Sequence, residues 1–184
     1  MERCYKARRM LLDKKGMLWV ATSNGLLAFS EKFERPDTID FHLFVCMPNK
    51  REVLSCNDIY DILLTHDGRL FFATFGGGLN ELKSLDKKGN ALFTSYSAKD
   101  GLPTDVLSSL AEDTKGDIWI GSENGLYIYL SDENKFINYK QNYNDKYSLN
   151  DNAIYTIFKD KENNMLVGTY FGGLNIFLNS FLQF

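Results

Sequence analysis

The sequence predicts an all-β fold of β-propeller blades, in which four-stranded antiparallel sheets stack face to face. Four segments share one template, in which a turn residue recurs at intervals of 52, 48 and 47 residues and a closing leucine at intervals of 53, 47 and 48. Repeats of roughly 40–50 residues with short apolar strands are typical of propellers, and one blade cannot bury both of its faces, so we expect the repeats to stack. The turn residues are Gly16, Gly68, Gly116 and Asn163, and the closing leucines are Leu26, Leu79, Leu126 and Leu174.

The third repeat shows the elements of a blade most clearly, with strands expected over residues 107–111, 118–122, 126–130 and 136–139. The first turn begins at Asp113, whose carboxylate can accept a hydrogen bond from the backbone two residues on. It ends at Gly116, which takes a positive φ without steric cost. The second turn contains Asn124-Gly125, a strong hairpin signal because both residues tolerate positive φ.

The two faces of the second strand are expected to meet different neighbours, because side chains alternate across a strand. Ile118 and Ile120 should face one adjacent blade, and Trp119 and Gly121 the other. The minimal side chain of Gly121 leaves space for the bulk of that neighbour. We expect a structural motif of recurring turn and strand residues, which comprises Trp19, Trp119, Gly16, Gly68, Gly116, Asp13, Asp113, Gly25 and Gly125.

The repeats also predict the domain organisation, which is a single partial propeller over residues 1–184. Its blades are expected at residues 7–50, 57–97, 105–142 and 152–184. The spacing from Phe177 to Phe184 equals that from Tyr129 to Phe136, so we expect the last blade to be truncated where its outer strand begins. Repeats two and four carry an extra glycine before the closing leucine, in FGGGL and YFGGL, which indicates a longer hairpin loop or a bulge.

Composition argues against several classes of function. The net charge is −3, and nucleic-acid binding would need clustered cations that the chain lacks outside a short N-terminal group. No stretch approaches the roughly 20 apolar residues of a membrane helix, and the first residues lack the apolar core of a signal peptide. Cys4, Cys46 and Cys56 do not have the spacing of a metal site, and the sequence leaves a Cys46–Cys56 disulfide open.

The sequence predicts no catalytic, metal-binding or cofactor-binding residues. His42 and His66 are the only histidines, and both are interpreted as surface residues. Aspartate recurs near every first turn, which favours a structural role, because a catalytic residue should be singular. The motifs of phosphate loops, dinucleotide-binding folds and calcium loops are absent. A propeller glycosidase or lyase is therefore the least favoured class.

Aromatic residues in loops give the best argument for binding. Tyr143 and Tyr147 lie in the polar segment KQNYNDKYSLNDN, and long loops on rigid scaffolds often carry function. Phe75 and Phe171 occupy glycine-rich loop tips. Aromatic rings offer stacking surfaces for sugars, and a tyrosine hydroxyl adds a hydrogen bond. These four residues are the candidate ligand-binding residues.

The segments DTKGDIWIGSENGLYIY and DKKGMLWVATSNGL resemble the two-component regulator propeller repeat, whose pattern runs D-x-x-G-x-[IL]-W-[IV]-G-T-x-x-G-L. The segment DGLPTDVLSSLAED resembles the linker and inner strand of that family, and the resemblance extends from about Ala7 to Phe177. It implies the extracytoplasmic sensor region of Bacteroides-type hybrid histidine kinases, a periplasmic location and an oligosaccharide ligand. The sequence departs from the family layout, because it holds about four repeats and no β-sandwich, membrane helix or kinase.

Three functions follow from these observations. The first is a non-catalytic sensor propeller fragment of a two-component receptor, which responds to a carbohydrate. The second is a free-standing interaction propeller that self-associates or docks on a partner. The third is a propeller enzyme. We expect the partners to be an oligosaccharide and either further copies of the chain or the remainder of a larger receptor.

Overall fold

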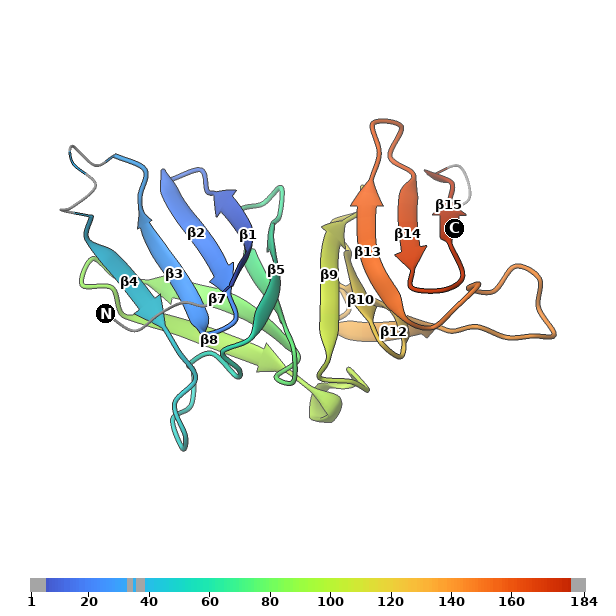
Figure 1. The fold of residues 1–184 in the computed structure, drawn as a ribbon, viewed down its shortest axis with the longest axis horizontal. Helices are drawn as coiled ribbons and strands as arrows, with labels where there is room; N and C mark the ends of the chain where they lie inside the picture. Colours follow the sequence, from blue (N-terminus) through green and yellow to red (C-terminus); the bar gives the residue numbers. More distant parts are fainter. Residues whose placement is uncertain (1–5, 33–34, 36–38, 180–184) are drawn as a thin grey trace.

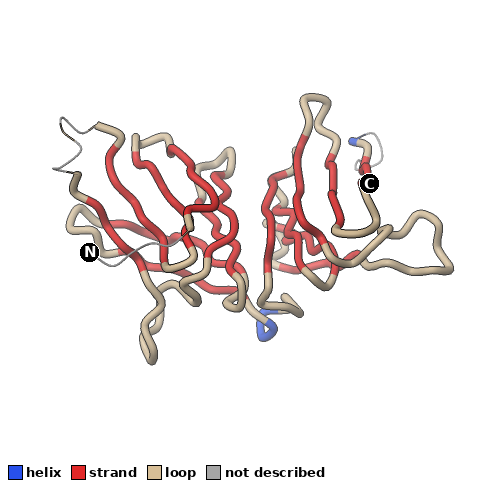
Figure 2. The backbone as a smooth tube through the Cα atoms, viewed as in Figure 1, coloured by secondary structure: helices blue, strands red, loops and turns tan. Residues whose placement is uncertain are grey.

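The computed structural model describes residues 6–32, 35 and 39–179. It consists of four antiparallel β-sheets, which confirms the predicted fold class (Figure 1). Loops join the strands almost throughout, and a short 3-10 helix, Ala98–Asp100, lies between the second and third sheets (Figure 2).

Each sheet corresponds to one repeat of the sequence and is called a blade below. Within a blade the strands pair in chain order. Blade one contains β1 (Ala7–Leu12), β2 (Met17–Thr22), β3 (Gly25–Ser30) and β4 (Phe41–Phe44), and blade two contains β5 (Ile59–Leu64), β6 (Leu70–Thr74), β7 (Leu79–Leu85) and β8 (Ala91–Tyr96). Blade three contains β9 (Leu107–Glu112), β10 (Ile118–Ser122), β11 (Gly125–Leu130) and β12 (Lys135–Tyr139), and blade four contains β13 (Ile154–Lys159), β14 (Met165–Thr169) and β15 (Leu174–Phe177).

The first strands of consecutive blades lie side by side, in the order β1, β5, β9 and β13. In Figure 1, β5 and β9 lie near the middle of the molecule, and β4 and β15 lie at its two far ends. The strands therefore run outward from a common inner edge, as in a propeller. The predicted outer strand of blade four begins at Phe184, which lies outside the described residues.

The turn between the first two strands is closed by a side chain. In blade three, the Asp113 carboxylate accepts hydrogen bonds from the Lys115 amide at 2.8 Å and from the Trp119 indole at 3.0 Å. In blade one, Asp13 bonds the Trp19 indole at 2.9 Å in the same way. The residues at the end of the four turns all have positive φ, namely Gly16 at 78°, Gly68 at 91°, Gly116 at 84° and Asn163 at 66°.

The second turn differs from the predicted Asn124-Gly125 hairpin. The two loop residues are Glu123 and Asn124, while Gly125 is the first residue of β11 and pairs with Ser122. Of these, only Gly125 has a positive φ, at 121°. A Cβ atom there would lie 2.7 Å from the Tyr139 carbonyl oxygen, so glycine is required for close approach to the neighbouring strand. Gly25 has the same geometry in blade one, with a φ of 120°.

Repeats two and four have longer second loops. Their extra glycine predicted either such a loop or a bulge. These loops cover residues 75–78 and 170–173. A β-bulge is also present, but in the first strand of every blade, where the sequence did not predict it. The register with the second strand shifts at the same position of each repeat. The four extra residues are Arg8, Tyr60, Ser108 and Tyr155.

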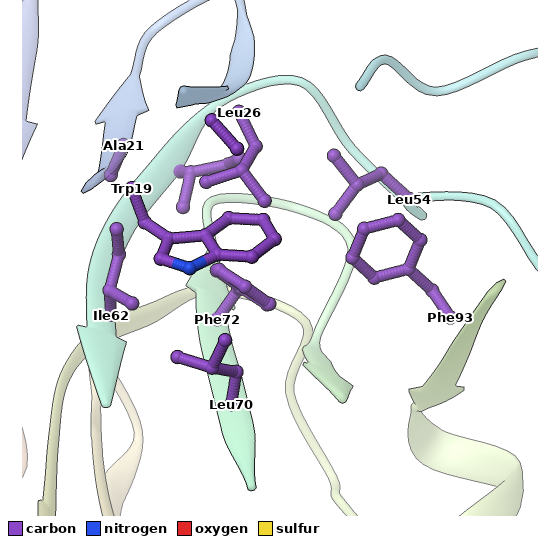
Figure 3. Packing of buried hydrophobic residues seen from close by; sticks show 10 residues of the cluster. Trp19, Ala21, Leu26, Leu54, Ile62, Leu70, Phe72 and Phe93 are labelled. Atoms are coloured by element: carbon purple, nitrogen blue, oxygen red, sulfur yellow. The ribbon is translucent and has the colours of Figure 1, made fainter. Parts of the chain in front are cut away.

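Three apolar cores fill the spaces between consecutive blades. Figure 3 shows the first core, where the Trp19 ring of blade one packs near Phe72 and Ile62 of blade two. The ring centroids of Trp19 and Phe72 are 5.9 Å apart.

The second strand of blade three uses its two faces as the alternation predicted. Ile118 and Ile120 belong to the core shared with blade two, and Trp119 belongs to the core shared with blade four. The bulk that Gly121 accommodates is Ile154 of blade four, because a Cβ atom on this glycine would lie 2.8 Å from Ile154 Cγ2.

Candidate functional site

The candidate site is a groove at one end of the blades. This end carries the second loop of each blade, which joins its second and third strands. Two equivalent positions of each repeat build it, the bulge residue of the first strand and the first residue of the second loop. The bulge residues were given above, and the matching loop residues are Ser23, Phe75, Glu123 and Tyr170. These two positions hold aromatic rings in blades two and four and small or polar residues in blades one and three.

Aromatic rings form two walls of the groove. In blade two, the Tyr60 and Phe75 rings stack with centroids 5.3 Å apart and an interplanar angle of 24°. In blade four, the Tyr155 and Tyr170 rings lie 6.4 Å apart at 58°. Blade three lies between them and carries only Ser108 and Glu123 at the equivalent positions, so it leaves a hollow. The groove has a volume of about 210 Å³, and blade three supplies its base.

Backbone hydrogen bonds fix the two aromatic loops. The Phe75 amide donates to the Asp58 carbonyl, and the Tyr170 amide to the Ala153 carbonyl, each at 2.8 Å. The Phe171 amide donates to the Asp151 carboxylate at 3.0 Å. This hydrogen bond holds the pKa of Asp151 below its usual value. The walls are therefore attached to the inner strands rather than carried on free loops.

Several polar groups of the groove are available to a ligand. Within the described part of the chain, the hydroxyls of Tyr60, Tyr155 and Tyr170 and the carboxylate of Glu123 have no hydrogen-bond partner. The Ser108 hydroxyl, in contrast, donates to the Ile154 carbonyl at 2.6 Å. The arrangement offers stacking surfaces together with hydrogen-bond donors and acceptors.

A cation lies behind one aromatic wall. The Arg8 guanidinium lies 3.6 Å from the centroid of the Tyr60 ring. It also pairs with the Asp58 carboxylate at 2.8 Å. Arg8 is therefore committed to holding the Tyr60 wall in place.

The four ligand candidates from the sequence separate into two groups. Phe75 is part of a wall, and Phe171 lies beside the groove with its ring centroid 4.7 Å from that of Tyr170. Tyr143 and Tyr147 lie on the loop before β13 and do not line the groove, and their side chains are 92% and 84% exposed. The ring of Tyr147 contacts the Lys146 ammonium at 4.8 Å.

Sequence reasoning did not select the three tyrosines of the walls, Tyr60, Tyr155 and Tyr170, as ligand candidates. The signal was present in the alignment of the repeats, because Tyr60 and Tyr155 both stand eight positions before the end of the first turn. It was not used, because an aromatic residue in a strand is most often a packing residue. The bulge turns this position out of the normal alternation.

A larger pocket of about 500 Å³ lies at the opposite end of blades one and two. Several of its charged groups are engaged within the fold, whereas Lys15 and Lys87, which also line it, have no side-chain partner among the described residues. Asp13 bonds its own turn and Trp19, Asp67 pairs with Arg69 at 2.8 Å, and the Lys83 ammonium bonds Glu81 at 2.6 Å. The aromatic groove is preferred as the candidate site because it combines pairs of aromatic rings with tyrosine hydroxyls.

The two histidines and the two described cysteines do not form a second site, and Cys4 lies outside the described residues. His66 Nδ1 lies 2.6 Å from Glu112 of the next blade, and His42 lies against Gly89. Cys46 and Cys56 are free thiols, so the disulfide that the sequence left open does not form. Within the residues the structure describes, no group of three or more His, Cys, Asp or Glu side chains is placed to hold a metal ion. None of the helices found in that part of the chain is long and apolar enough to span a membrane.

Four stacked antiparallel blades with a groove at one end define this chain as β-propeller structure. Residues 101–124 and 148–171 match the family model described as two component regulator propeller. These two segments therefore match the repeat family that the resemblance predicted. A search of curated proteins found no match.

Solved structures share the fold. The extracellular domain of a one component system from B. thetaiotaomicron is 22% identical over 96% of this chain, with a TM-score of 0.53. The extracellular domain of a hybrid two component system from the same organism is 18% identical over 96% of this chain, with a TM-score of 0.50. The chain spans 28% of the length of each of these domains. Virginiamycin B lyase from Staphylococcus aureus is 15% identical over 96% of this chain and 57% of its own, with a TM-score of 0.60.

Proposed function

We propose that this chain is the ligand-binding part of a sensor propeller and that it binds a carbohydrate in the aromatic groove over blade three. The observation that carries the proposal is the pair of aromatic walls, Tyr60 with Phe75 and Tyr155 with Tyr170, on either side of blade three. Sugar rings present apolar faces that stack on aromatic side chains and hydroxyls that need hydrogen-bond partners. The groove offers both.

The repeat family and the similar structures support a sensor role outside the cytoplasm. The matched family is named for two-component regulators, and two similar structures are extracellular domains of one- and two-component systems. We therefore propose a periplasmic location. The output of the sensor would come from parts of a receptor that these repeats do not supply.

The groove favours binding over catalysis. Among the described residues that line it, Glu123 is the one carboxylate, and the other titratable groups are tyrosines. General acid–base chemistry on a sugar usually uses two carboxylates that face each other across the bond. The similarity to a lyase is a similarity of fold, at 15% identity. We propose that the chain binds its ligand without turning it over.

The proposal is tested by substitution of the two walls. Tyr60→Ala and Tyr155→Ala should each weaken binding of a glycan found by array screening by roughly fivefold, because each removes a stacking surface worth on the order of 1 kcal/mol. Isothermal titration gives the affinity, and circular dichroism checks the fold. Tyr143→Ala is the comparison, because this ring is on the protruding loop. Loss of binding in Tyr143→Ala alone would move the site to that loop.

A second function, an interaction propeller, is favoured by a separate observation. The face of blade four that points away from blade three exposes the large apolar residues Phe158, Leu174 and Ile176. Contiguous exposed apolar surface often marks a protein interface. Self-association through this face is compatible with ligand binding in the groove, and its test is given in the Discussion.

A further inference from the structure

We propose that the groove discriminates by charge: it accepts uncharged sugars and rejects anionic ones such as uronic acids and sulfated sugars. The inference rests on the proposed function, because it names the class of carbohydrate that the same site would take. The evidence for it is the set of charged side chains around the groove and the contacts that each of them makes.

The groove holds one charged side chain among its described lining residues, and it is negative. Glu123 is the first residue of the second loop in blade three, at the position that Phe75 and Tyr170 occupy in the flanking blades. Its side chain is exposed, and within the described residues its carboxylate has no partner. A ligand between the two aromatic walls therefore meets a carboxylate that is free to interact.

Two cations close to the groove make contacts within the fold. Arg8 pairs with Asp58 at 2.8 Å and lies against the Tyr60 ring. The Lys140 ammonium donates to the Asn124 side-chain oxygen at 2.9 Å. Recognition of a carboxylate or sulfate normally uses a charge-assisted hydrogen bond from Arg or Lys. Neither Arg8 nor Lys140 lines the groove, so its described lining offers no cation for such a bond.

A second carboxylate reinforces the negative field. The Asp151 carboxylate accepts a hydrogen bond from the Phe171 amide beside the groove, and this bond lowers the pKa of Asp151. Like charges a few ångströms apart repel, whereas a neutral sugar hydroxyl can donate a hydrogen bond to a carboxylate. The tyrosine hydroxyls of the walls can both donate and accept. The groove is thus matched to a ligand with many hydroxyls and no negative charge.

The experiment measures binding of neutral and acidic hexasaccharides to the full chain by isothermal titration. The neutral probes are cellohexaose, mannohexaose and maltohexaose, and the acidic probes are hexagalacturonate and a hyaluronan hexasaccharide. Any neutral hit is then oxidised at its primary hydroxyls to give a uronate of the same skeleton. We expect the uronate form to bind at least roughly tenfold more weakly than the neutral form, as expected for one repelled charge in a partly exposed site.

Glu123→Gln removes the charge and keeps an amide of similar size. It should strengthen binding of the uronate form by roughly threefold to tenfold, and added salt should reduce this gain. Glu133→Gln is the matched control, because it makes the same change in the turn at the opposite end of blade three. This control should leave both affinities unchanged.

The outcomes separate the inference from the proposed function. The inference is supported if the chain binds neutral glycans and not acidic ones, and if Glu123→Gln restores binding of the acidic ones. An acidic glycan bound as tightly as the neutral ones would overturn the inference and leave carbohydrate binding intact. No binding of any probe would overturn the proposed carbohydrate function and the inference with it.

Discussion

The first turns show how one side-chain pair varies among the repeats of a single chain. A buried indole N–H needs a partner, and Asp13 and Asp113 supply one to Trp19 and Trp119. Blade two has Phe71 in place of tryptophan, and Thr65 replaces the aspartate. The donor and its acceptor are thus both absent there, which leaves neither group unsatisfied.

Blade four keeps the turn aspartate but loses the indole. Leu166 occupies the tryptophan position, and the second oxygen of the Asp160 carboxylate accepts a hydrogen bond from the Asn164 side chain at 2.9 Å. The aspartate carboxylate of this turn therefore has a hydrogen-bond donor whether the second strand supplies tryptophan or leucine at the tryptophan position. This gives the recurring aspartates a structural role in the first turn.

Trp119 should be a major contributor to stability at the residue scale. Trp119→Ala removes a buried ring from the core between blades three and four and leaves Asp113 without its indole partner. We expect the free energy of unfolding to fall by about 3–5 kcal/mol in denaturant titrations. Tyr143→Ala, at an exposed ring, is the control and should cost under about 0.5 kcal/mol. Equal effects of the two changes would contradict the blade register described above.

Asp61 gives a pH dependence with a defined sign. Burial raises the pKa of Asp61 above its usual 3.8, although the Leu110 amide and the Arg9 guanidinium act in the opposite direction. The folded state therefore holds this proton to a higher pH than the unfolded state. The contribution of Asp61 to stability is full below pH 3.8 and is lost as the pH rises through the folded-state pKa.

The comparison of wild type with Asp61→Asn isolates this effect. The difference in unfolding free energy, wild type minus variant, should fall as the pH rises from about 4 and then level off. Chemical denaturation at a series of pH values measures it. Asp40→Asn, at an exposed carboxylate, should give a difference with little pH dependence. A difference that instead rises with pH would show that the ion pair with Arg9 outweighs burial.

At the scale of the elements, the bulge in each first strand lets that strand bond the next blade. Arg9 pairs with Asp61 at 3.2 Å, Asp61 accepts the Leu110 amide at 2.8 Å, and the Ser109 hydroxyl accepts the Ile157 amide at 3.0 Å. These contacts form one polar line through all four inner strands. The apolar cores give the blades affinity for one another, and the polar line fixes their register.

The glycine in the second strand of blade three tests the close approach of the blades. Gly121→Ala would place a Cβ atom 2.8 Å from Ile154 Cγ2 and 2.9 Å from Ser108 Oγ. Overpacking of this kind costs roughly 1–3 kcal/mol, which thermal or denaturant unfolding would detect. Ile154→Ala is also destabilising, but the double variant should lose less than the sum of the two single losses. Simple additivity would mean that the two positions are not in contact.

At the scale of the whole molecule, the two end blades expose complementary faces. Blade one has the half-buried residues Leu18, Leu27 and Phe29 on its outer face, at the positions of Ile118, Tyr127 and Tyr129 that pack against blade two. Blade four presents Phe158, Leu166 and Ile176, at positions that pack against the next blade elsewhere in the chain. The two faces therefore correspond to the two halves of an inter-blade interface, and a second copy of the chain can join them head to tail.

Light scattering tests this association. We expect a molar mass that rises with concentration above the 21.1 kDa of one chain. Phe158→Lys places a charge on the exposed face of blade four and should shift the equilibrium toward the monomer. Tyr147→Lys makes the same charge change on a protruding loop and should not. A monomer at every concentration in the unmodified chain would rule out head-to-tail association.

The sequence by itself determined the blade architecture, because it is written in a local and repeated code. The period, the aspartate and glycine of the first turn, and the alternation that sends Ile118 and Trp119 to opposite neighbours all lie within one repeat. The strong match of repeats three and four to the propeller family reflects the same local pattern. Of the candidate site, the loop-tip ring of Phe75 was predicted for the same reason.

Only the tertiary structure decided where the groove lies. Its walls combine residues from blades two and four that are about 95 positions apart, and no local pattern records that distance. The position of Tyr60 and Tyr155 depends on a bulge that interrupts the alternation, and the hollow between them depends on the small residue Ser108 in the intervening blade. The stacking of blades brings these positions together, which is why the exposed rings of Tyr143 and Tyr147 could be predicted as candidates and yet lie outside the groove.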